Sequence, residues 1–497
     1  MKTKLHIRRG ISALSTALFI GLLFVSCTLR PTAPPSSETD GPPTTTDSAQ
    51  NAWDALPYIS YDGYSFRIVL RDMEIAKEDM FQEDGGTGDD GVATAVRNRN
   101  VKVEDRFGVS LVPVVRSTDF TDMVSLFAGD AEYDLILPHA RYAALYAGGG
   151  YLLDWNTIPG IRLDGSWWDQ NARASLSISH RLFYMTGDIS YWSYGATNML
   201  LFNKRLFDDL NLTYPYQTVK DRSWTLDEFE TLVKEGPADL NGDGMMDAEN
   251  DRFGYMTMGF IGDVQAYHAT GNTVVSKDID DIPYISYMTT RAETVWQWYS
   301  DLIGSDACYF QDRLVSYFDT DAVKGFRDGR SLFTDINTIN VAEMRKMDDD
   351  FGILPWPTLA EGEPYLTNVD AGMHLFCVPY TTVDPERTGL ILEGLAVLGQ
   401  QTVIPEYMEK TVRYKQTRDD ESFEMLDLIF AGRVYDLGYY NVELTGAVGQ
   451  DEAIANNFKH LTENKIKSMS LVWARSGEAA EAYLQTYLQK LEKAVNP

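Results

Sequence analysis

Residues 239–251 carry oxygen-bearing side chains at alternate positions, which is the spacing of a calcium-binding loop. Gly244 would allow the sharp turn after the third ligand. The twelfth position holds Asn250 instead of a bidentate Glu, so an Asx-turn loop without metal stays an equal alternative. A calcium ion here would be structural, because such a loop gives it no redox or hydrolytic task. The predicted metal ligands are Asp239, Asn241, Asp243, Met245, Asp247 and Asp251.

Other motifs that carry chemistry are weak or missing. The segment 86–91 has the glycine spacing of a dinucleotide-binding loop, but it follows a polar stretch, and Asp89 and Asp90 would repel a pyrophosphate. The sequence contains no HExxH, GxSxG or P-loop motif, and the five histidines beyond residue 26 lie far apart. We therefore expect a protein that is not an enzyme and has no cofactor besides the hypothetical calcium ion.

Aromatic and polar residues gather where the chain is expected to leave its strands. Saccharides are recognised by planar side chains against their ring faces and by carboxylates or amides on their hydroxyls, in concave and mostly apolar sites. In α/β folds, ligands bind beyond the carboxyl ends of strands. The strand ends near 137 and 334 and the glycine-bounded segment 187–195 therefore supply the candidates. The predicted ligand-binding residues are Arg141, Tyr142, Asp188, Trp192, Tyr194, Asp335, Asn337 and Asp370.

The elements that must position these residues alternate between strands and helices. The sequence predicts strands over 64–70, 109–115 and 133–138 and a helix over 98–107, which together favour an α/β domain with a largely parallel sheet. A helix over 223–236 has the pattern of a capping box at Thr225 and Glu228, with Trp224 and Phe229 placed as its hydrophobic staple. Apolar residues at helical spacing over 480–495 predict a final amphipathic helix.

The N-terminus has the three parts of an export signal. A basic start is followed by the uncharged apolar run 11–25, which is short for a membrane span and fits a signal peptide over 1–26. The run ends in LFVSC, which resembles the bacterial lipobox, although Phe24 stands where Leu is usual. We expect lipid on Cys27, then a disordered linker over 27–57 rich in Pro, Ser and Thr. The expected location is the extracellular face of the cell membrane, through this lipid anchor.

Composition limits the partners. The 497-residue chain is long enough for two or more domains. Its formal charge of −30 argues against nucleic acid, because a phosphate backbone would be repelled. Cys308 and Cys377 are well separated, and we expect both to be buried thiols.

Five segments together resemble the extracellular solute-binding proteins (family 1-like, oligosaccharide-type) of bacterial ABC importers. The similarity lies in their order and spacing and covers nearly all of the chain after the linker. Phe202 stands where the family strand that ends in "YNK" has Tyr. The segments are 196–207 (ATNMLLFNKRLF), 223–229 (SWTLDEF), 239–255 (with DLNGDG and DRFGY), 351–357 (FGILPWP) and 403–407 (VIPEY).

The resemblance implies an α/β fold of two lobes, periplasmic-binding-protein-like (type II), with a hinge and a cleft between the lobes. Lobe I would be 58–190 plus 325–376, with 331–334 as its returning strand, and lobe II 191–324 plus 377–497. The chain would capture a sugar or oligosaccharide and deliver it to the membrane permease. The alternatives are a surface-attached glycan-degrading enzyme and a carbohydrate-binding adhesion lipoprotein without a transport role.

Overall fold

The computed structural model describes most of the chain beyond residue 50. The predictions for the signal peptide, Cys27 and almost all of the loop 86–91 therefore lie outside the described residues. The described residues are 51–495 except 83–90, 118–123, 125–126, 128–132, 260, 312–320, 410–418, 447–457, 459–460 and 463–465.

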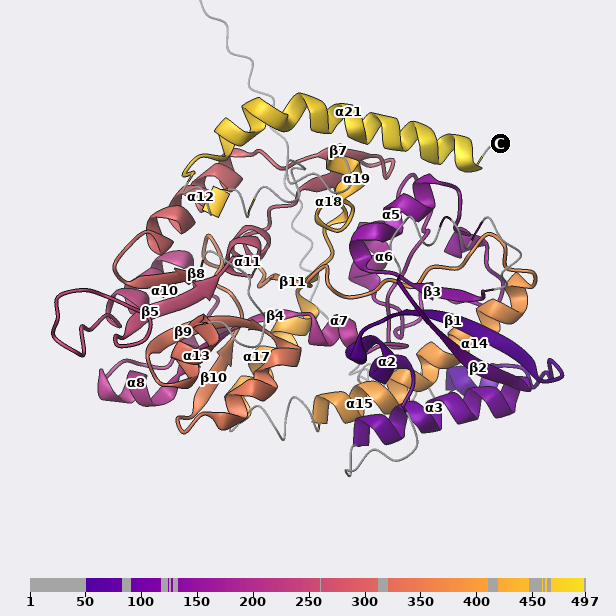
Figure 1. Ribbon diagram of the computed structural model, residues 1–497, viewed down its shortest axis with the longest axis horizontal. Coiled ribbons are helices and arrows are strands. Elements are labelled where there is room, and N and C mark those ends of the chain that lie inside the picture. The colour runs from indigo at the N-terminus through magenta and orange to yellow at the C-terminus, as the bar shows by residue number, and fades with distance from the viewer. Residues whose placement is uncertain are drawn as a thin grey trace, which may run out of the picture. The chain divides into compact units, whose positions relative to one another are not determined.

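The first sheet has three parallel strands in the order β2-β1-β3, and we call it the β1 sheet (Figure 1). Ile68, Val69 and Leu70 are fully buried, so an apolar run marks the centre of this sheet. Helix α3 connects β1 to β2 and packs against α14; it begins at Gly91, earlier than the sequence indicated. The main elements are β1 (Tyr64–Arg71), α3 (Gly91–Phe107), β2 (Val109–Arg116), β3 (Leu135–Leu137), α5 (Ala140–Gly148) and α14 (Pro385–Leu398).

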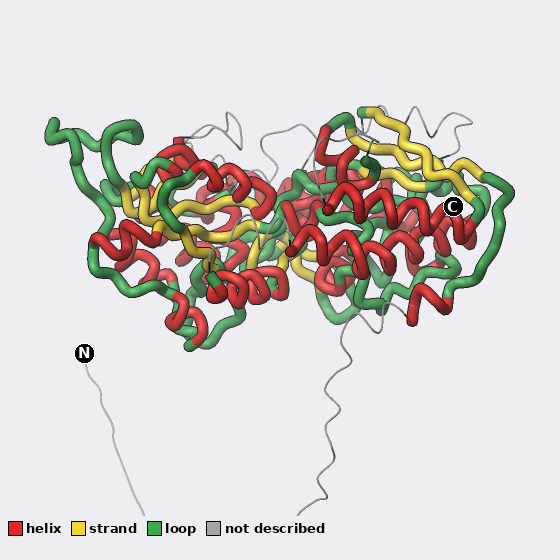
Figure 2. Tube along the Cα trace, turned by 90° about the horizontal axis from the view of Figure 1, so that it is seen from below, coloured by secondary structure: helices red, strands yellow, loops and turns green. Residues whose placement is uncertain are grey.

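The second sheet has five strands in the order β10-β4-β9-β5-β8, and we call it the β4 sheet. β4 runs antiparallel to β9 and β10, whereas β5 runs parallel to β8 and β9. All residues of β4 and β9 are buried, because helices cover the sheet (Figure 2). The strands are β4 (Asn198–Asn203), β5 (Phe253–Met258), β8 (Cys308–Gln311), β9 (Ser331–Asn337) and β10 (Phe351–Leu354).

The assignment of strands to lobes needs a correction. Residues 331–334 were predicted to form a returning strand of lobe I, but β9, which contains them, pairs with β4 and β5 in the β4 sheet, and β10 joins the same sheet. Conversely, Cys377, expected in lobe II, forms an isolated bridge with Ile136 of β3. A buried apolar run predicts a strand but does not specify the partner strand, which long-range packing selects.

Three stretches of the described chain connect the two sheets. They run through α7 (Trp192–Gly195), β11 (Thr367–Asn368) and the pair β12 (Arg433–Val434) with α18 (Leu437–Tyr440). β11 and β12 pair in parallel, with Thr367 opposite Arg433, so two of the connections are joined by backbone hydrogen bonds. In Figure 1, α7 and β11 lie between the two sheets.

Two ends of the described chain pack onto the body. Residues 51–55 form a helical turn, and Ala52 and Leu56 are buried. The prediction of a disordered linker over 27–57 is therefore wrong for its last residues. Apolar side chains four positions apart cover the core there, and Arg106 lies over the Trp53 ring. At the other end, α21 (Met469–Val495) confirms the predicted final helix and contacts α5 on one side and α12 on the other (Figure 1).

The remaining elements surround these sheets. Cys308 and Cys377 are free and buried, as predicted. Within the described residues, no helix is both long and apolar enough to cross a membrane. The other elements are α2 (Glu74–Met80), η1 (Trp155–Thr157), α6 (Gln170–Leu176), α8 (Lys204–Asp209), α9 (Tyr216–Lys220), α10 (Leu226–Lys234), α11 (Gly262–Ala269), β6 (Val275–Lys277), β7 (Pro283–Ile285), α12 (Thr290–Ile303), α13 (Asp321–Arg327), η2 (Thr338–Lys346), η3 (Gly399–Val403), α15 (Ile404–Glu406), α17 (Asp420–Ala431) and α19 (Val442–Thr445).

Candidate functional site

A cavity of about 460 Å³ lies where strands of both sheets and the connecting segments end. Its volume is within the range of small-molecule sites in proteins. The lining residues are Arg71, Met73, Ile75, His139, Arg141, Trp192, Ala196, Asn337, Ile339, Asn340, Asp370, Ala371, Gly372 and Tyr439.

The lining comes from the ends of elements. Arg71 is the last residue of β1, His139 follows β3, and Asn337 is the last residue of β9. Asp370 follows β11, and Trp192 opens α7. The cavity therefore lies beyond the carboxyl ends of strands and on two of the connecting segments, where ligand sites of α/β folds are found.

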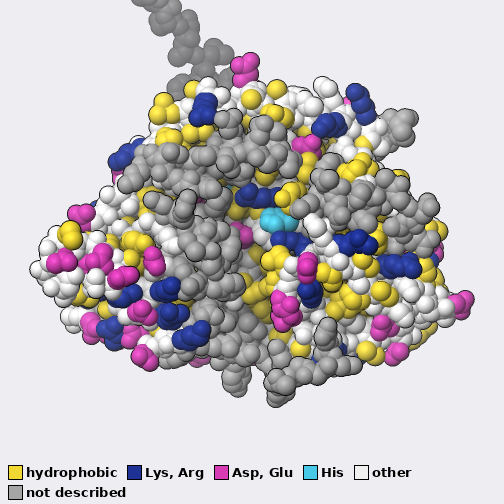
Figure 3. Space-filling view, viewed as in Figure 1, with side chains coloured by type: hydrophobic (Ala, Val, Ile, Leu, Met, Phe, Trp, Pro, Cys, Tyr) yellow, Lys and Arg dark blue, Asp and Glu magenta, His cyan; other side chains and the backbone are white. Residues whose placement is uncertain are grey.

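Two arginines lie against aromatic rings of the lining. The Arg71 Cζ atom is 5.4 Å from the centroid of the Trp192 ring, and the Arg141 Cζ atom is 5.2 Å from that of Tyr439. Arg71 Nη1 also donates a hydrogen bond of 2.7 Å to the Gly372 carbonyl. Cation–π contacts at these distances hold each guanidinium group near the cavity. In Figure 3, a histidine and several Lys or Arg side chains gather near the middle of the face shown.

Two titratable groups of the lining, Asp370 and His139, are shielded from water. Burial raises the pKa of Asp370, while the hydrogen bond from the Gly372 amide (2.7 Å) and the charges of Arg141 and Arg71 act in the opposite direction. Burial lowers the pKa of His139 to about 3, and both arginines lower it further. His139 is therefore neutral near pH 7, and its Nδ1 atom accepts a hydrogen bond from the Arg141 amide at the start of α5.

The lining also contains amide oxygens that no protein group satisfies. Asn337 is 5% exposed and Asn340 4%. Among the described residues, neither Oδ1 atom has a hydrogen-bond partner. Buried polar atoms are almost always paired, so two unpaired acceptors in one cavity indicate a place for a ligand that donates hydrogen bonds.

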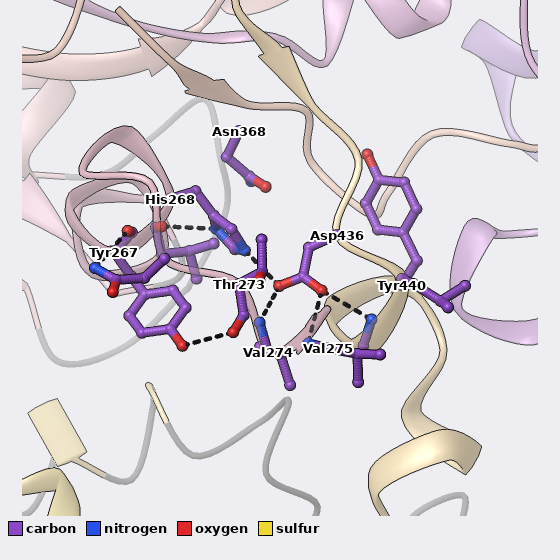
Figure 4. A network of polar contacts seen from close by, with 12 residues as sticks. Tyr267, His268, Thr273, Val274, Val275, Asn368, Asp436 and Tyr440 are labelled. Atoms are coloured by element: carbon purple, nitrogen blue, oxygen red, sulfur yellow. Dashed lines mark hydrogen bonds and ion pairs between the residues drawn. The ribbon is translucent and has the colours of Figure 1, made fainter. Parts of the chain in front are cut away.

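A polar network holds α18, which carries Tyr439 into the lining (Figure 4). The Asp436 carboxylate accepts hydrogen bonds from the Gly438 amide (2.8 Å) and the Val274 amide (2.5 Å). His268 Nε2 lies 2.9 Å from Asp436 Oδ2, and both side chains are fully buried. The network ties the start of α18 to α11 and β6 and so fixes the position of the Tyr439 ring.

The structure brings four of the eight predicted ligand-binding residues into this cavity, and ligand binding by them stays a prediction. They are Arg141, Trp192, Asn337 and Asp370. Tyr142 does not line the cavity but contacts a residue that does. Its ring makes an edge contact with the His139 ring, with centroids 5.8 Å apart.

Asp188 and Tyr194 belong to a separate buried cluster. Asp188 accepts hydrogen bonds from the Tyr194 hydroxyl (3.0 Å) and from Gln400 Nε2 (2.9 Å). The Arg433 Cζ atom lies 4.1 Å from the Tyr194 ring centroid, and Arg433 Nη2 lies 2.6 Å from Asp169 Oδ2. Burial raises the pKa of Asp188 to about 7. Neither residue lines the cavity, because their side chains contact protein groups between α7 and β12, and ligand binding by them stays a prediction.

Asp335 lies within the β4 sheet and does not line the cavity. Its Oδ1 atom accepts a hydrogen bond of 3.0 Å from the Tyr255 hydroxyl, and burial raises its pKa to about 7. Asp335 and Asn337 lie two residues apart on the same strand, but only Asn337 stands at the strand end that lines the cavity.

Of the lining residues with charged, polar or aromatic side chains, four were not predicted as binding candidates: Arg71, His139, Asn340 and Tyr439. The rule about strand ends could have found Arg71 and His139, since both stand directly after or at the end of a strand of the β1 sheet. The sequence around Tyr439 does not predict that this residue lies at the cavity. The contact between Asp436 and the distant helix α11 brings it there.

In the predicted calcium loop, backbone amides donate hydrogen bonds to carboxylates of the same loop. The Asp239 carboxylate accepts from the Gly242 and Gly244 amides, and the buried Asp251 carboxylate accepts from the Leu240 and Asp247 amides. Nowhere in the described parts of the chain do three or more His, Cys, Asp or Glu side chains form a group able to hold a metal ion. The arrangement fits the Asx-turn interpretation, and calcium binding stays a prediction.

Comparisons with known proteins find likeness in structure and not in sequence. No protein-family model and no curated protein matches the chain. A cyclo/maltodextrin-binding protein complexed with maltotetraose has a TM-score of 0.53 at 13% identity, covering 87% of this chain and 97% of its own. The GacH receptor of Streptomyces glaucescens, solved unliganded and with acarbose, has a TM-score of 0.53 at 14% identity, over 85% and 99%.

A third structure is an ABC transporter solute-binding protein of Thermotoga lettingae bound with α-D-tagatose. Its TM-score is 0.53 at 13% identity, and the match covers 86% of this chain and all of that one. The chain thus has the two-lobed α/β fold of periplasmic solute-binding proteins, and the predicted fold class is confirmed.

Proposed function

We propose that the chain is the substrate-binding protein of an ABC importer and that it captures a sugar or oligosaccharide in the cavity between its two sheets. The observation that carries the proposal is the pairing of aromatic rings with unsatisfied amide oxygens in one lining. Trp192 and Tyr439 supply planar surfaces for sugar rings. Asn337 and Asn340 supply acceptors for sugar hydroxyls.

The lining is divided between the two sheets, which suits a protein that closes on its ligand. Arg71 ends β1 and Arg141 follows β3, both strands of the β1 sheet. Asn337 ends β9 of the β4 sheet, and Asn340 lies in η2, which follows β9 directly. A solute that contacts both sides favours the conformation in which they are close together. The closed form would then be the one that the membrane permease recognises, so binding would shift the population toward delivery.

A catalytic role receives less support from the side chains. Glycoside hydrolysis generally uses two carboxyl groups, and the cavity lining within the described residues contains one, Asp370. Ser190, His374 and Asp79 lie together, with His374 Nε2 3.2 Å from both Ser190 Oγ and Asp79 Oδ2. All three are buried, and Ser190 donates to Asp79 directly, so the cluster has the features of internal packing.

The proposal includes the predicted anchor. Lipid on Cys27 and the linker that follows it would hold the protein on the extracellular face of the membrane, near the permease. This part is supported by the N-terminal sequence pattern. Metabolic labelling with a radioactive fatty acid tests it: wild type should take up label, and Cys27→Ser should not.

Isothermal titration calorimetry against neutral and charged mono- and oligosaccharides tests the binding function. We expect one saccharide class to bind without turnover, and Trp192→Ala to weaken that binding. Trp298→Ala is the matched control, because Trp298 lies on α12 and bonds to Glu230 away from the cavity. Small-angle scattering should show a more compact protein with the bound saccharide. Hydrolysis of the bound saccharide, abolished by Asp370→Asn, would instead favour the glycan-degrading alternative.

A further inference from the structure

The hairpin formed by β6 and β7 reaches from one lobe to the other. It belongs to the lobe of the β4 sheet, because it follows α11, which packs against β5, and precedes α12, which packs against β8. Its residues 277–281 bond to residues 174–180. Beyond that segment, Met185 pairs with Phe376, and the residue after Phe376 pairs with β3, so the segment belongs to the lobe of the β1 sheet. In Figure 1, β7 lies beside α21, which contacts helices of both lobes.

Asp281 binds the backbone of the facing segment. Its carboxylate accepts hydrogen bonds from the His180 amide (2.8 Å) and the Ser177 hydroxyl (2.9 Å). Its main-chain carbonyl accepts a third hydrogen bond from the Ser179 amide (2.9 Å). One residue of the hairpin thus satisfies two consecutive amides and a hydroxyl of the other lobe. Hydrogen bonds to an ionised carboxylate are stronger than those between neutral groups.

Lys277 adds a second charged group to the same contact. Its ammonium group lies 2.5 Å from Asp281 Oδ1. It donates hydrogen bonds to the Ser177 hydroxyl (2.7 Å) and carbonyl (3.1 Å), and also to the Ala174 carbonyl. The side chains of Lys277 and Asp281 are 15% and 14% exposed, so water reaches little of the pair. We call Lys277, Asp281 and the groups of residues 174–180 that they bind the clasp.

The backbone is strained on both sides of the clasp. Of the six non-glycine residues with left-handed φ in the described chain, three are in the clasp: Ser179 (52°), His180 (62°) and Asp281 (60°). Such conformations persist only where the surrounding structure holds them, and they gather at clamps and switch regions. Opening the clasp would break its hydrogen bonds and release this strain, so the two effects partly offset each other. A contact of this kind is suited to separate and form again as the lobes move.

The clasp lies outside the cavity but bears on its shape. None of its residues is among the described lining of the cavity, which comes from both sheets. The arrangement in which the clasp is formed is therefore the one in which the two sides of the cavity face each other. Bonds that exist only in this arrangement favour it over the open one, and they raise affinity without touching the solute.

We propose, on the basis of the function proposed above, that the clasp stabilises the closed arrangement of the lobes and sets how often the empty protein opens. Helix α21 supplies a second contact of the same kind. Near its start, the Met469 amide donates to the Glu293 carboxylate of α12 (2.8 Å). Near its end, the Tyr487 hydroxyl donates to the Ala144 carbonyl of α5 (3.1 Å). The clasp and α21 thus hold together two lobes that the three connecting stretches would allow to separate.

Pulsed electron paramagnetic resonance of the protein without any saccharide measures the distance between the lobes. Spin labels are attached at Lys102→Cys on α3 and Glu228→Cys on α10, which are exposed positions of different lobes. Cys308 and Cys377 are buried, and Cys27→Ser removes the third thiol. We expect one narrow distribution of distances when the clasp is intact.

Variants of the hairpin separate the clasp from the rest of the fold. Asp281→Ala should increase the share of molecules at longer distances about tenfold or more, because it removes hydrogen bonds to an ionised group. Lys277→Met should act in the same direction. Asp278→Ala is the matched control, because that carboxylate lies on the same hairpin but accepts from the Asp280 and Ile282 amides of its own turn. It should keep the distances of the intact clasp.

The outcomes distinguish the two proposals. Circular dichroism melts show which variants are folded, and Ser177→Ala, the mildest change, takes the place of the other two if they are not. If the folded clasp variants keep the distances of the intact protein, the clasp is excluded and the binding function stands, even where their melting temperatures fall. If Asp278→Ala lengthens the distances as much as Asp281→Ala, the charge of the hairpin and not the clasp is responsible, which also overturns the inference. If the clasp variants open the lobes but no saccharide binds in calorimetry, the clasp is retained and the binding function is overturned.

Discussion

Trp192 and Tyr194 stand two residues apart on one short helix, yet they belong to two regions with different tasks. Trp192 lines the cavity beside Arg71 and Asp370. Tyr194 turns into the buried cluster formed with Asp188 and Arg433. Both regions contain an aromatic ring, an arginine and an aspartate, so residue types alone do not separate a binding site from a structural joint.

What separates the two regions is whether their acceptor oxygens find donors inside the protein. Both oxygens of Asp188 accept hydrogen bonds, one from Tyr194 and one from Gln400. In the cavity, the Oδ1 atoms of Asn337 and Asn340 have no partner among the described residues. The first region joins α7 to β12 and holds the connection between the sheets. The second region has buried acceptor atoms without donors in the described chain, and a ligand can supply those donors.

The largest effect on stability is expected in the buried cluster. Arg433→Met leaves Asp169 without its ion pair, which is 2.6 Å long and almost fully buried. Removing one partner of a buried pair costs roughly 3–5 kcal/mol in the free energy of unfolding. Chemical denaturation measures it. Arg205→Met is the control, because its pairs with Asp349 and Asp209 lie at the surface and should cost less than about 1 kcal/mol. Equal losses in the two variants would contradict the contrast.

The next effect concerns ligand affinity, where the two aromatics of α7 should behave in opposite ways. Trp192→Ala removes a stacking surface from the cavity and should weaken saccharide binding by about 1–3 kcal/mol, by the usual worth of a desolvated aromatic contact. Tyr194→Phe removes only the hydroxyl that donates to Asp188, so it should lower the melting temperature and leave the affinity nearly unchanged. Calorimetry and thermal melts on both variants check this, and a larger loss of affinity in Tyr194→Phe would reverse the assignment.

The same contrast explains how far the sequence could predict the site. Arg141 and Asn337 were found because each follows a predicted strand, and backbone geometry puts such residues at one edge of a sheet. Asp370 was found because it stands just before an expected crossing between the lobes. Asp188 and Tyr194 satisfied the rule about strand ends, but only packing across 200 or more residues reveals that Gln400 donates to the Asp188 carboxylate and that Arg433 lies over the Tyr194 ring. A local sequence pattern therefore indicates which strand end carries a side chain, but it does not indicate which distant residues that side chain contacts.

The fold shows the same limit. The strands β1, β2 and β3 follow from runs of apolar and β-branched residues, and the two-lobed fold class was predicted from the order of the segments. The placement of β9 failed because all seven of its residues are buried, polar ones included, so its pattern does not show which sheet it joins. The start of α3 at Gly91 was missed for a related reason, since its first turns have only a short apolar stripe.

A pH dependence should follow from the buried cluster. The folded pKa of Asp188 is about 7, above the usual value near 4, because burial disfavours its charge. The folded protein then binds this proton more tightly than the unfolded chain, so the free energy of unfolding rises as the pH falls from above 7 toward about 4. One such group contributes about 1.4 kcal/mol per pH unit within that window. Denaturant melts of wild type and Asp188→Asn at pH 8, 7, 6 and 5 measure it, and identical slopes for the two proteins would contradict it.

The smallest effect is expected at the loop 239–251. Its carboxylates already accept backbone hydrogen bonds, and Asn250 stands at the bidentate position, so any calcium affinity should be at the millimolar end of the range for such loops. A few millimolar calcium should then raise the melting temperature by about 1–2 °C, and Asp243→Asn, which alters an exposed ligand, should remove that shift. The loop contributes no lining residue to the cavity, so EDTA should leave saccharide affinity unchanged. If EDTA abolished saccharide binding, a metal ion would be part of the binding site in addition to the protein side chains.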